Sequence, residues 1–437
     1  MTKAAKVNER QIVLEILLAV TRDGAYCHLA TADVLEKYQF LDKKSRAFIT
    51  RLSAGTLERM IEIDYILDQF SKTPVRKMKP VIRCILRSGV YQLKYMDAVP
   101  SSAACNEAVR LAEKRGFGAL KGFVNGVLRS IDRALQNDAV AYPDETTDFV
   151  HYAGIRYSLP EWIVQLWVEQ RGVEETKQIC ENLYTRTATA IRVNTNRTTK
   201  EALTEELAKD GITVTESDLV EDAFYISGYD YLQALPAFHA GDFYVQDVSS
   251  MLSVLAAGIK PGDEVVDVCA APGGKAIYAA QLLEHTGHVQ ARDLTDHKVD
   301  LIEENIDRCQ MDNMDALVWD ATIPDETIVG AKDVVIADLP CSGLGILRKK
   351  PDIRFHQKPE QLQELAQLQR EILSVVQAYT KSGGTLVFST CTINRGENED
   401  NTAWFLENYP MFQLQEEKQL LVDEQHDGFY YAVFRRR

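Results

Sequence analysis

Apolar residues recur at intervals of three and four positions through the first 137 residues of the chain. In RQIVLEILLAV, the residues Val13, Ile16, Leu17 and Val20 fall on one side of a helix, the side that a bundle would bury. The same spacing returns in TRLSAGTLERMIEIDYILDQF, KPVIRCILRSGVYQLKYM and NEAVRLAEKR, and no strand signal interrupts it. The pattern therefore predicts an all-α bundle over residues 1–138.

A shorter, mixed segment follows the predicted bundle. Residues 139–158 include the polar, proline-containing stretch AVAYPDETTDF, which is typical of a linker. LPEWIVQLWVEQRG then has helical spacing, and TAIRVNTNRTTKEALTEELAKDGITVT has the pattern of strand, helix and strand. We predict a small α/β subdomain over residues 159–235.

From residue 236 to residue 437 short apolar runs alternate with helical stretches. EVVDVCA, HVQARDL, DALVWDA, DVVIADLP and TLVFSTC have the character of buried strands, and KAIYAAQLLE and KVDLIEENIDRC that of helices. Alternating strands and helices predict a Rossmann-like α/β domain, a parallel sheet covered on both faces. Such a sheet binds its ligand at the carboxyl ends of the strands.

Charge is distributed unevenly along the chain. The net charge is −15, but residues 1–140 hold 23 Lys and Arg against 15 Asp and Glu, a net of +8. The remaining residues carry a net of −23. A basic module joined to an acidic one favours binding of a polyanion such as nucleic acid to the basic part. The alternative is that the helices simply carry charged outer faces.

Cysteine and apolar patterns narrow the class of protein further. The eight cysteines are scattered without CxxC or zinc-ligand spacing, which favours reduced thiols in a cytoplasmic protein and no metal site. The histidine pair in HTGH at 285–288 fits a surface turn better than a metal. No apolar run is long enough to cross a bilayer, and MTKAAKVNERQ lacks the apolar core of a secretory signal.

A small-residue turn and two acids mark successive predicted strand ends. CAAPGGK at 269–275 joins a strand to a helix, so its main-chain N–H groups can approach a ligand closely. Asp293 ends the next strand, where a carboxylate can bind a ribose diol, and Asp320 ends the third and could reach an adenine. This order favours an adenosyl ligand. The alternative is that each Asp only caps the following helix.

Two cysteines follow the next strands in loop-like surroundings. Cys341 lies in DLPCSG, where Pro340 stiffens the turn and aims Asp338 and Cys341, and Cys391 lies between two threonines in STC. A lone buried thiol is usually a small hydrophobe, but two loop thiols at neighbouring strand ends indicate chemistry. LRKKPDIRF at 347–355 adds four basic residues that we interpret as a phosphate clamp, with a solvated charged loop as the alternative. They are Arg348, Lys349, Lys350 and Arg354.

These motifs resemble known families. SSAACNEAVRLAEKRGFGALKGFVNGVLRSI at 101–131 resembles the signature of the NusB-like RNA-binding domain. CAAPGGK, DLPCSG and STCTINRGENED resemble the RNA 5-methylcytosine methyltransferases, and the whole chain is similar to the Sun family, which methylates C5 of a cytosine in small-subunit (16S) ribosomal RNA. YVQDVSS at 244–250 also fits. Leu339 and Thr392 depart from the usual alanine and serine without changing the reactive groups.

The resemblance implies a function for each motif. Cytosine C5 attacks a sulfonium only after a thiolate has added to C6, which is covalent catalysis on a base taken out of its stack. By resemblance Cys391 is the nucleophile, Cys341 assists release of the RNA, and Asp338 contacts the cytosine edge. Lys275 would add positive potential, although it could instead cap the loop. S-adenosylmethionine would be held by Cys269, Ala270, Ala271, Pro272, Gly273, Gly274, Lys275, Asp293, Asp320 and Asp338.

Partners and rival functions follow from the same comparison. The resemblance implies ribosomal RNA of the small subunit as partner, an RNA-binding role for residues 159–235, no DNA, no membrane and a monomer. IRVNTNR in the subdomain fits plain scaffold equally well. The rivals are a methyltransferase acting on another RNA such as tRNA, a DNA cytosine-5 methyltransferase that uses the Pro-Cys cysteine as nucleophile, and a non-catalytic RNA-binding assembly factor.

Overall fold

The computed structural model describes residues 8–38, 40–185 and 188–437. The chain divides into two compact units, of which the first combines residues 1–181 with residues 349–356. The second unit comprises residues 182–348 and 357–437. Residues 1–7, which carry much of the expectation about a secretory signal, lie outside the described part of the chain.

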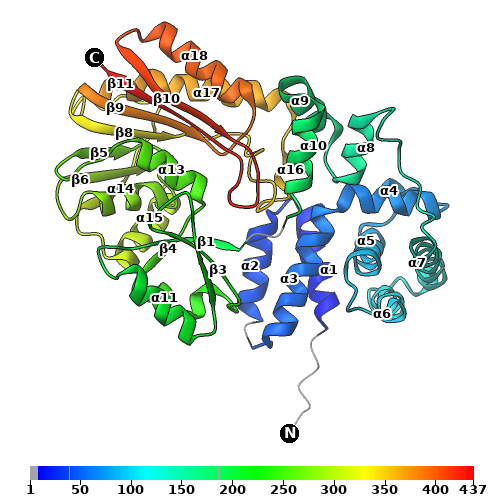
Figure 1. The fold of residues 1–437 in the computed structure, drawn as a ribbon. Helices are drawn as coiled ribbons and strands as arrows, with labels where there is room; N and C mark the ends of the chain where they lie inside the picture. The colour runs from blue at the N-terminus through cyan, green and yellow to red at the C-terminus, as the bar shows by residue number, and fades with distance from the viewer. Residues whose placement is uncertain (1–7, 39, 186–187) are drawn as a thin grey trace. The chain divides into compact units, whose positions relative to one another are not determined.

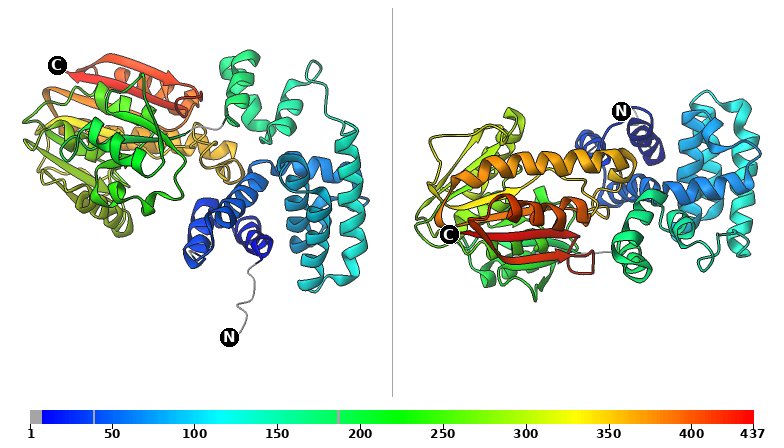
Figure 2. Two further views of the ribbon diagram at one scale, coloured as in Figure 1. Left: turned by 60° about the horizontal axis from the view of Figure 1, so that its bottom comes forward. Right: turned by 90° about the horizontal axis from the view of Figure 1, so that it is seen from above.

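The first unit is helical, as its sequence pattern predicts. Its helices are α1 (Glu9–Thr21), α2 (Cys27–Lys37), α3 (Lys43–Glu58), α4 (Met60–Phe70), α5 (Pro80–Tyr95), α6 (Ser101–Lys114), α7 (Lys121–Gln136), α8 (Phe149–Arg156), α9 (Glu161–Arg171), α10 (Val173–Asn182) and α16 (Ile353–His356), with short 3-10 turns η1 (Val75–Lys77) and η2 (Gly118–Leu120). Helices α5, α6 and α7 lie side by side, seen lengthwise in the left view of Figure 2. The predicted all-α bundle is confirmed.

The helices of this unit form because each has one apolar face to bury. In α7 the residues Val124, Val127, Leu128 and Ile131 are buried in the common core, while its charged residues face outward. Side-chain oxygens satisfy free N–H groups at helix starts: Asn8 caps α1 in this way.

The structure differs from the predicted linker over residues 139–158. Helix α8 forms inside it, capped by Asp148, and the connecting segment is anchored on Glu62 of α4. The buried Glu62 carboxylate accepts hydrogen bonds from Tyr142 and Lys94, both at 2.8 Å, and from Arg156 at 3.3 Å. Helices α9 and α10, predicted to open the α/β subdomain, also belong to the helical unit.

Residues 349–356 are a late segment of the chain that completes the helical unit. The main-chain N–H of Cys27 donates to the buried Asp352 carboxylate at 2.8 Å. Arg354 is 1% exposed, and its guanidinium donates to the carbonyls of Ser158 at 2.9 Å and Glu58 at 3.2 Å. No compositional signal in the sequence indicates that residues 349–356 pack into the first unit.

The second unit contains two sheets (Figure 1). The smaller sheet has the order β2-β3-β1-β4, and its pairs are antiparallel. Strand β4 extends this sheet beyond the predicted boundary at residue 235. Its elements are β1 (Thr189–Val193), α11 (Lys200–Lys209), β2 (Thr213–Glu216), β3 (Ala223–Ser227), the turn η3 (Leu232–Ala234), α12 (Pro236–Ala240) and β4 (Phe243–Val245).

The larger sheet has seven strands in the order β10-β11-β9-β8-β5-β6-β7. Strands β7, β6, β5, β8 and β9 are parallel, and β11 is antiparallel to both β9 and β10. The strands are β5 (Glu264–Asp267), β6 (His288–Asp293), β7 (Met314–Val318), β8 (Lys332–Asp338), β9 (Thr380–Thr390), β10 (Phe412–Leu420) and β11 (Phe429–Arg436). The predicted Rossmann-like fold is confirmed.

Helices cover both faces of this sheet (Figure 1). One face packs its valines, such as Val265 and Val289, against α13, α14 and α15, and the other packs Val335 and Phe388 against α17 and α18. The helices are α13 (Val248–Ala256), α14 (Gly274–Leu282), α15 (Asp296–Cys309), α17 (Pro359–Val376) and α18 (Glu399–Asn408), with turns η4 (Gln377–Tyr379) and η5 (Arg395–Glu397). Burial on both faces explains the continuous apolar strands.

Among the residues that the structure describes, none of the helices has the length and apolar character required to span a membrane.

Candidate active site

The small-residue turn lies between the end of β5 and the start of α14. Gly273 has a φ of +105°, a conformation that favours glycine, and it directly precedes α14. Asp293, at the end of β6, accepts the Ala271 N–H at 3.0 Å, and the Ala270 N–H donates to the Arg292 carbonyl at 2.8 Å. These bonds from the neighbouring strand fix the shape of the turn.

The smaller sheet supports the turn from the other side. Arg192 of β1 is 1% exposed, and its guanidinium lies 4.1 Å from the centre of the Tyr278 ring on α14. It also donates to the Gly274 carbonyl at 3.2 Å. Burial lowers the pKa of Arg192 to about 10, so the group stays charged at neutral pH. The helix start is thus held by a cation of the adjoining sheet.

A cavity opens where the turn meets the strand ends. Its lining combines the turn with two carboxylates and one ammonium group. The lining residues are Tyr244, Val245, Gln246, Asp267, Cys269, Ala270, Ala271, Pro272, Gly274, Lys275 and Asp338. Most of the predicted cofactor residues are therefore gathered in one place, with Asp267 and residues 244–246 added.

Asp267 is the most perturbed acid of the cavity. It is 1% exposed, and its Oδ2 has no hydrogen-bond partner among the described residues. Burial raises the pKa of Asp267 to about 7, although Lys275 opposes the shift. A carboxylate in this position is suited to receive a cationic or hydrogen-bond-donating ligand group.

Lys275 and Asp338 form an ion pair at the edge of the cavity. Lys275 Nζ lies 2.5 Å from Asp338 Oδ2, and the Ser389 hydroxyl donates to Asp338 Oδ1 at 2.8 Å. Burial alone lowers the pKa of Lys275, but the charges of Asp338, Asp267 and Cys391 outweigh it and raise that pKa. The ammonium group is therefore held in its charged form at the edge of the cavity.

The two cysteines at the ends of β8 and β9 are in direct contact. Cys341 Sγ and Cys391 Sγ lie 3.2 Å apart, and both thiols are free. The pKa of Cys341 is raised well above its ordinary value because its thiol shares a hydrogen bond with Cys391 and is buried. Cys341 therefore keeps its proton at neutral pH. Cys269 is a neutral packing residue, because burial raises its pKa.

A buried carboxylate ties the two cysteine loops together. Glu397 of η5 accepts the Ser342 N–H at 2.8 Å and the Ser342 hydroxyl at 2.5 Å, next to Cys341. It also accepts the side-chain amide of Asn394 at 2.9 Å. The hydroxyls of Ser342 and Thr392 are 2.8 Å apart, which joins the residues that follow the two cysteines.

Two of the acids predicted to hold the cofactor, Asp293 and Asp320, lie outside the cavity lining. Asp293 is 3% exposed and also accepts Lys298 Nζ at 2.8 Å. Asp320 Oδ1 accepts the main-chain N–H and the hydroxyl of Thr322 at 2.9 and 2.7 Å, and these bonds lower its pKa. These bonds lie within the turn that follows β7, and no helix begins there for Asp320 to cap.

The basic segment does not form the clamp that its sequence indicates. The Arg354 side chain is buried against main-chain carbonyls, and Arg348 pairs with Asp427 at 2.9 Å while only 8% of its side chain is exposed. A phosphate clamp made of all four cations is therefore wrong, since both arginines already serve the fold. Only Lys349 and Lys350 are exposed.

Sequence reasoning missed several residues of the site. Asp267 carries the same signal as the other acids, an aspartate at a strand end, and was overlooked. Glu397 gives no such signal, because its role depends on the loop around Ser342, 55 positions away. Among the described residues, no three His, Cys, Asp or Glu side chains are arranged to hold a metal ion.

Sequence comparisons match all three parts of the chain. Residues 254–435 match the model described as 16S rRNA methyltransferase RsmB/F, residues 7–133 the NusB family, and residues 159–229 a ferredoxin-like domain of RsmF/B-like methyltransferases. A Bacillus subtilis protein, "Probable ribosomal RNA small subunit methyltransferase B", is 37% identical over 93% of this chain and 90% of its own. The Vibrio cholerae ribosomal RNA small subunit methyltransferase B is 31% identical over 91% of each chain.

Solved structures share the fold. PH0851 superimposes with a TM-score of 0.80 at 24% identity, covering 99% of this chain and 100% of that one. NSun6 from Pyrococcus horikoshii, solved with SFG, an S-adenosylmethionine analogue, gives a TM-score of 0.56 at 23% identity over 63% of this chain and 98% of its own. The resemblance noted from the motifs is confirmed, and the chain belongs to the S-adenosylmethionine-dependent 16S rRNA methyltransferase RsmB/F family.

Proposed function

We propose that the protein methylates C5 of a specific cytosine in small-subunit (16S) ribosomal RNA through a covalent bond between Cys391 and C6. The observation that carries this proposal is the pair of free thiols 3.2 Å apart, beside the Lys275–Asp338 ion pair at a cavity that suits the cofactor. It acts in the cytoplasm as a monomer.

The cavity residues fit S-adenosylmethionine. Its methionine part carries an ammonium group. This group would donate a hydrogen bond to the unpaired carboxylate oxygen of Asp267. Cys269–Lys275 and Asp293 would hold the adenosine part, with Asp320 reaching its base and Asp338 next to the sulfonium. When bound, the cofactor supplies an electrophilic methyl group. The protein's part is to make cytosine C5 reactive enough to accept it.

Each residue at the strand ends has a part in that activation. Cys391 adds to C6 as a thiolate, which Lys275 favours through its positive charge. Asp338 contacts the cytosine edge as charge develops at N3. Once C5 carries the methyl group, a base removes the C5 proton and the Cys391–C6 bond breaks, restoring the C5–C6 double bond. Cys341, which stays protonated, assists this release.

Two alanine variants separate the roles of the thiols. Cys391→Ala should abolish methylation and form no covalent bond to RNA. Cys341→Ala should still add to C6 and methylate C5, then accumulate as an RNA adduct that survives a denaturing gel. Adduct in Cys391→Ala and none in Cys341→Ala would overturn the assignment, because it is the pattern expected if Cys341 attacks. Thermal melting of both variants checks that the fold is intact.

The target is tested by mapping. Bisulfite sequencing should detect one 5-methylcytosine in the 16S RNA of cells that have the protein. The same position should be unmodified in cells that lack it. Loss of a modified cytosine from tRNA alone would reject the ribosomal target while keeping the chemistry.

A further inference from the structure

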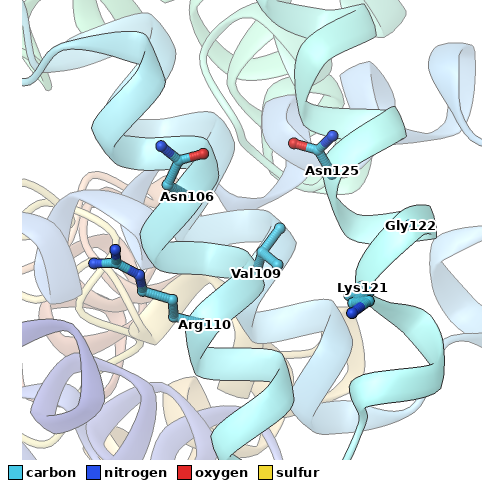
Figure 3. A pocket seen from close by; sticks show the side chains of 6 residues that line it. All are labelled: Asn106, Val109, Arg110, Lys121, Gly122 and Asn125. Carbon is cyan, nitrogen blue, oxygen red and sulfur yellow. The ribbon is translucent and has the colours of Figure 1, made fainter.

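The half-buried thiols of this protein lie at strand ends of the larger sheet, in Cys269, Cys341 and Cys391. Among the described residues, the pocket between helices α6 and α7 of the helical unit is lined by no thiol (Figure 3). Its lining residues are Asn106, Val109, Arg110, Lys121, Gly122 and Asn125. The sulfurs of Cys341 and Cys391, by contrast, are free and 3.2 Å apart. Two free thiols at this separation can react with each other as well as with a substrate.

The main chain on both sides of the two cysteines holds their sulfurs together. The parallel strands β8 and β9 pair Asp338 with Ser389, shortly before the two cysteines. Beyond them, the Gly345 N–H donates to the Cys391 carbonyl at 3.1 Å, and the Gly428 N–H donates to the Gly345 carbonyl at 2.9 Å. A disulfide bond is about 2.05 Å long, so the sulfurs need to approach each other by only about 1 Å. A bond between them therefore requires little movement of the loops.

The two sulfurs differ in how they meet an oxidant. Cys391 is the nucleophile of the proposed function, and a nucleophilic thiol is also the one that a hydroperoxide oxidises first. The pKa of Cys341 is raised by its hydrogen bond with Cys391 and by burial, so Cys341 stays a protonated thiol. Cys341 is thus the less reactive partner, in direct contact with the sulfur that is oxidised.

The other cysteines are poorly placed to compete for an oxidant. The susceptibility of a thiol to oxidation follows its exposure and its thiolate character. Burial raises the pKa of the half-buried Cys269, which therefore stays a thiol. Burial also raises the pKa of five further cysteines, all of them buried: Cys27, Cys84, Cys105, Cys180 and Cys309. Oxidation is therefore directed to the contacting pair.

From these contacts we propose that Cys341 and Cys391 form a site of reversible oxidation, at which a hydroperoxide joins the two sulfurs and stops methylation. The hydroperoxide transfers its terminal oxygen to Cys391, which becomes a sulfenic acid, and leaves as an alcohol or as water. Cys341 then attacks that sulfur, the S–S bond forms, and the hydroxyl group departs as water with the Cys341 proton. A dithiol restores both thiols by exchange and is itself oxidised to a disulfide. The proposal rests on the proposed function, because the disulfide blocks the nucleophile assigned there.

The second cysteine protects the first from irreversible damage. A sulfenic acid on Cys391 without a neighbouring thiol would be oxidised further to a sulfinic acid, which thiols do not reduce. Capture by Cys341 keeps the modification at a stage that a dithiol reverses. Neither cysteine is among the residues that line the cofactor cavity, so the oxidised protein should still bind S-adenosylmethionine.

Hydrogen peroxide applied to the full-length protein tests the proposal. The oxidised wild type should lose two thiols per chain, and peptide mapping without reductant should find Cys341 linked to Cys391. Methylation of a small-subunit ribosomal RNA transcript should fall to background and return fully after dithiothreitol, while the Kd for S-adenosylmethionine stays unchanged throughout. Cys309→Ala is the matched control, because it removes a buried thiol distant in sequence from the pair, and it should oxidise and recover as the wild type does.

Cys341→Ala provides the second arm of the experiment. After peroxide treatment its Cys391 should be found as a sulfinic acid, and dithiothreitol should not restore formation of the RNA adduct. Full recovery of this variant, or a wild-type disulfide that joins Cys391 to any other cysteine, overturns the proposal. So does inactivation of the wild type while both thiols stay free. Peptide mapping requires no RNA, so a mapped disulfide in a protein that methylates no RNA would reject the proposed function and leave the oxidation site standing.

Discussion

Asp267 has a carboxylate oxygen without a partner, at the end of a buried strand. Burial raises its folded-state pKa to about 7, well above the ordinary pKa of an aspartate, so the folded protein binds a proton that the unfolded chain has already lost. The stability due to this proton is present below about pH 4 and is lost as pH rises toward 7. In the cofactor-free protein, ionised Asp267 therefore opposes folding at neutral pH.

Asp267→Asn should remove this pH dependence. We expect the Tm of the variant minus that of the wild type to rise between pH 4 and pH 7, by an amount equivalent to a few kcal/mol at most, on the order of 1.4 kcal/mol for each unit of pKa shift. The same variant should bind S-adenosylmethionine more weakly in calorimetry. A Tm difference that stays constant with pH would show that Asp267 titrates normally.

At the scale of elements, the loops after β8 and β9 act as one piece because Glu397 binds both. Removing its carboxylate takes away the acceptor of the buried Ser342 N–H and one partner each of the Ser342 hydroxyl and the Asn394 amide. Glu397→Ala should cost about 2–4 kcal/mol of stability and lower kcat for methylation, since the two sulfurs lose their fixed separation. Chemical denaturation and single-turnover assays measure the two effects.

An exposed acid of the next helix gives the control for that change. Asp400→Asn in α18 alters a side chain that is 55% exposed and should affect neither quantity. If Glu397→Ala is destabilised but retains the wild-type kcat, the carboxylate serves the fold alone.

The elements were easier to predict than the site. Strands such as EVVD and helices such as α7 can be predicted from apolar spacing. An element that is buried on one face or on both has apolar residues at characteristic intervals in the sequence. The strand-end rule also brought Asp338 and both cysteines together at one edge of the sheet. Helix α8 was missed because a helix of eight residues is too short to show a clear apolar period.

At the scale of the whole molecule, Arg354 shows what local patterns cannot reveal. LRKKPDIRF has the composition of an exposed basic loop, yet Arg354 binds carbonyls of residues 58 and 158, which are about 300 and 200 positions earlier. The sequence shows the charge of a residue but not the distant carbonyls that bury it.

Arg354→Ala should therefore destabilise the helical unit. Loss of its buried hydrogen bonds is expected to cost about 2–4 kcal/mol and to lower the Tm by several degrees. Lys350→Ala, an exposed cation of the same segment, should leave the Tm unchanged. Equal melting temperatures for Arg354→Ala and the wild type would show that the buried hydrogen bonds of Arg354 do not stabilise the helical unit.

Residues 349–356 also determine whether the first unit can be separated from the rest of the chain by proteolysis or truncation. A protease that cut the chain near residue 182 would not release the first unit, because the chain returns to it eight residues after Cys341 and leaves again at residue 357. A recombinant fragment ending at residue 181 would lack α16 and the partner of the Cys27 N–H. The helical unit is thus not a detachable module. Its contribution to RNA binding has to be measured by substitutions in the intact chain, and exchange of this domain between relatives requires both segments to be exchanged together.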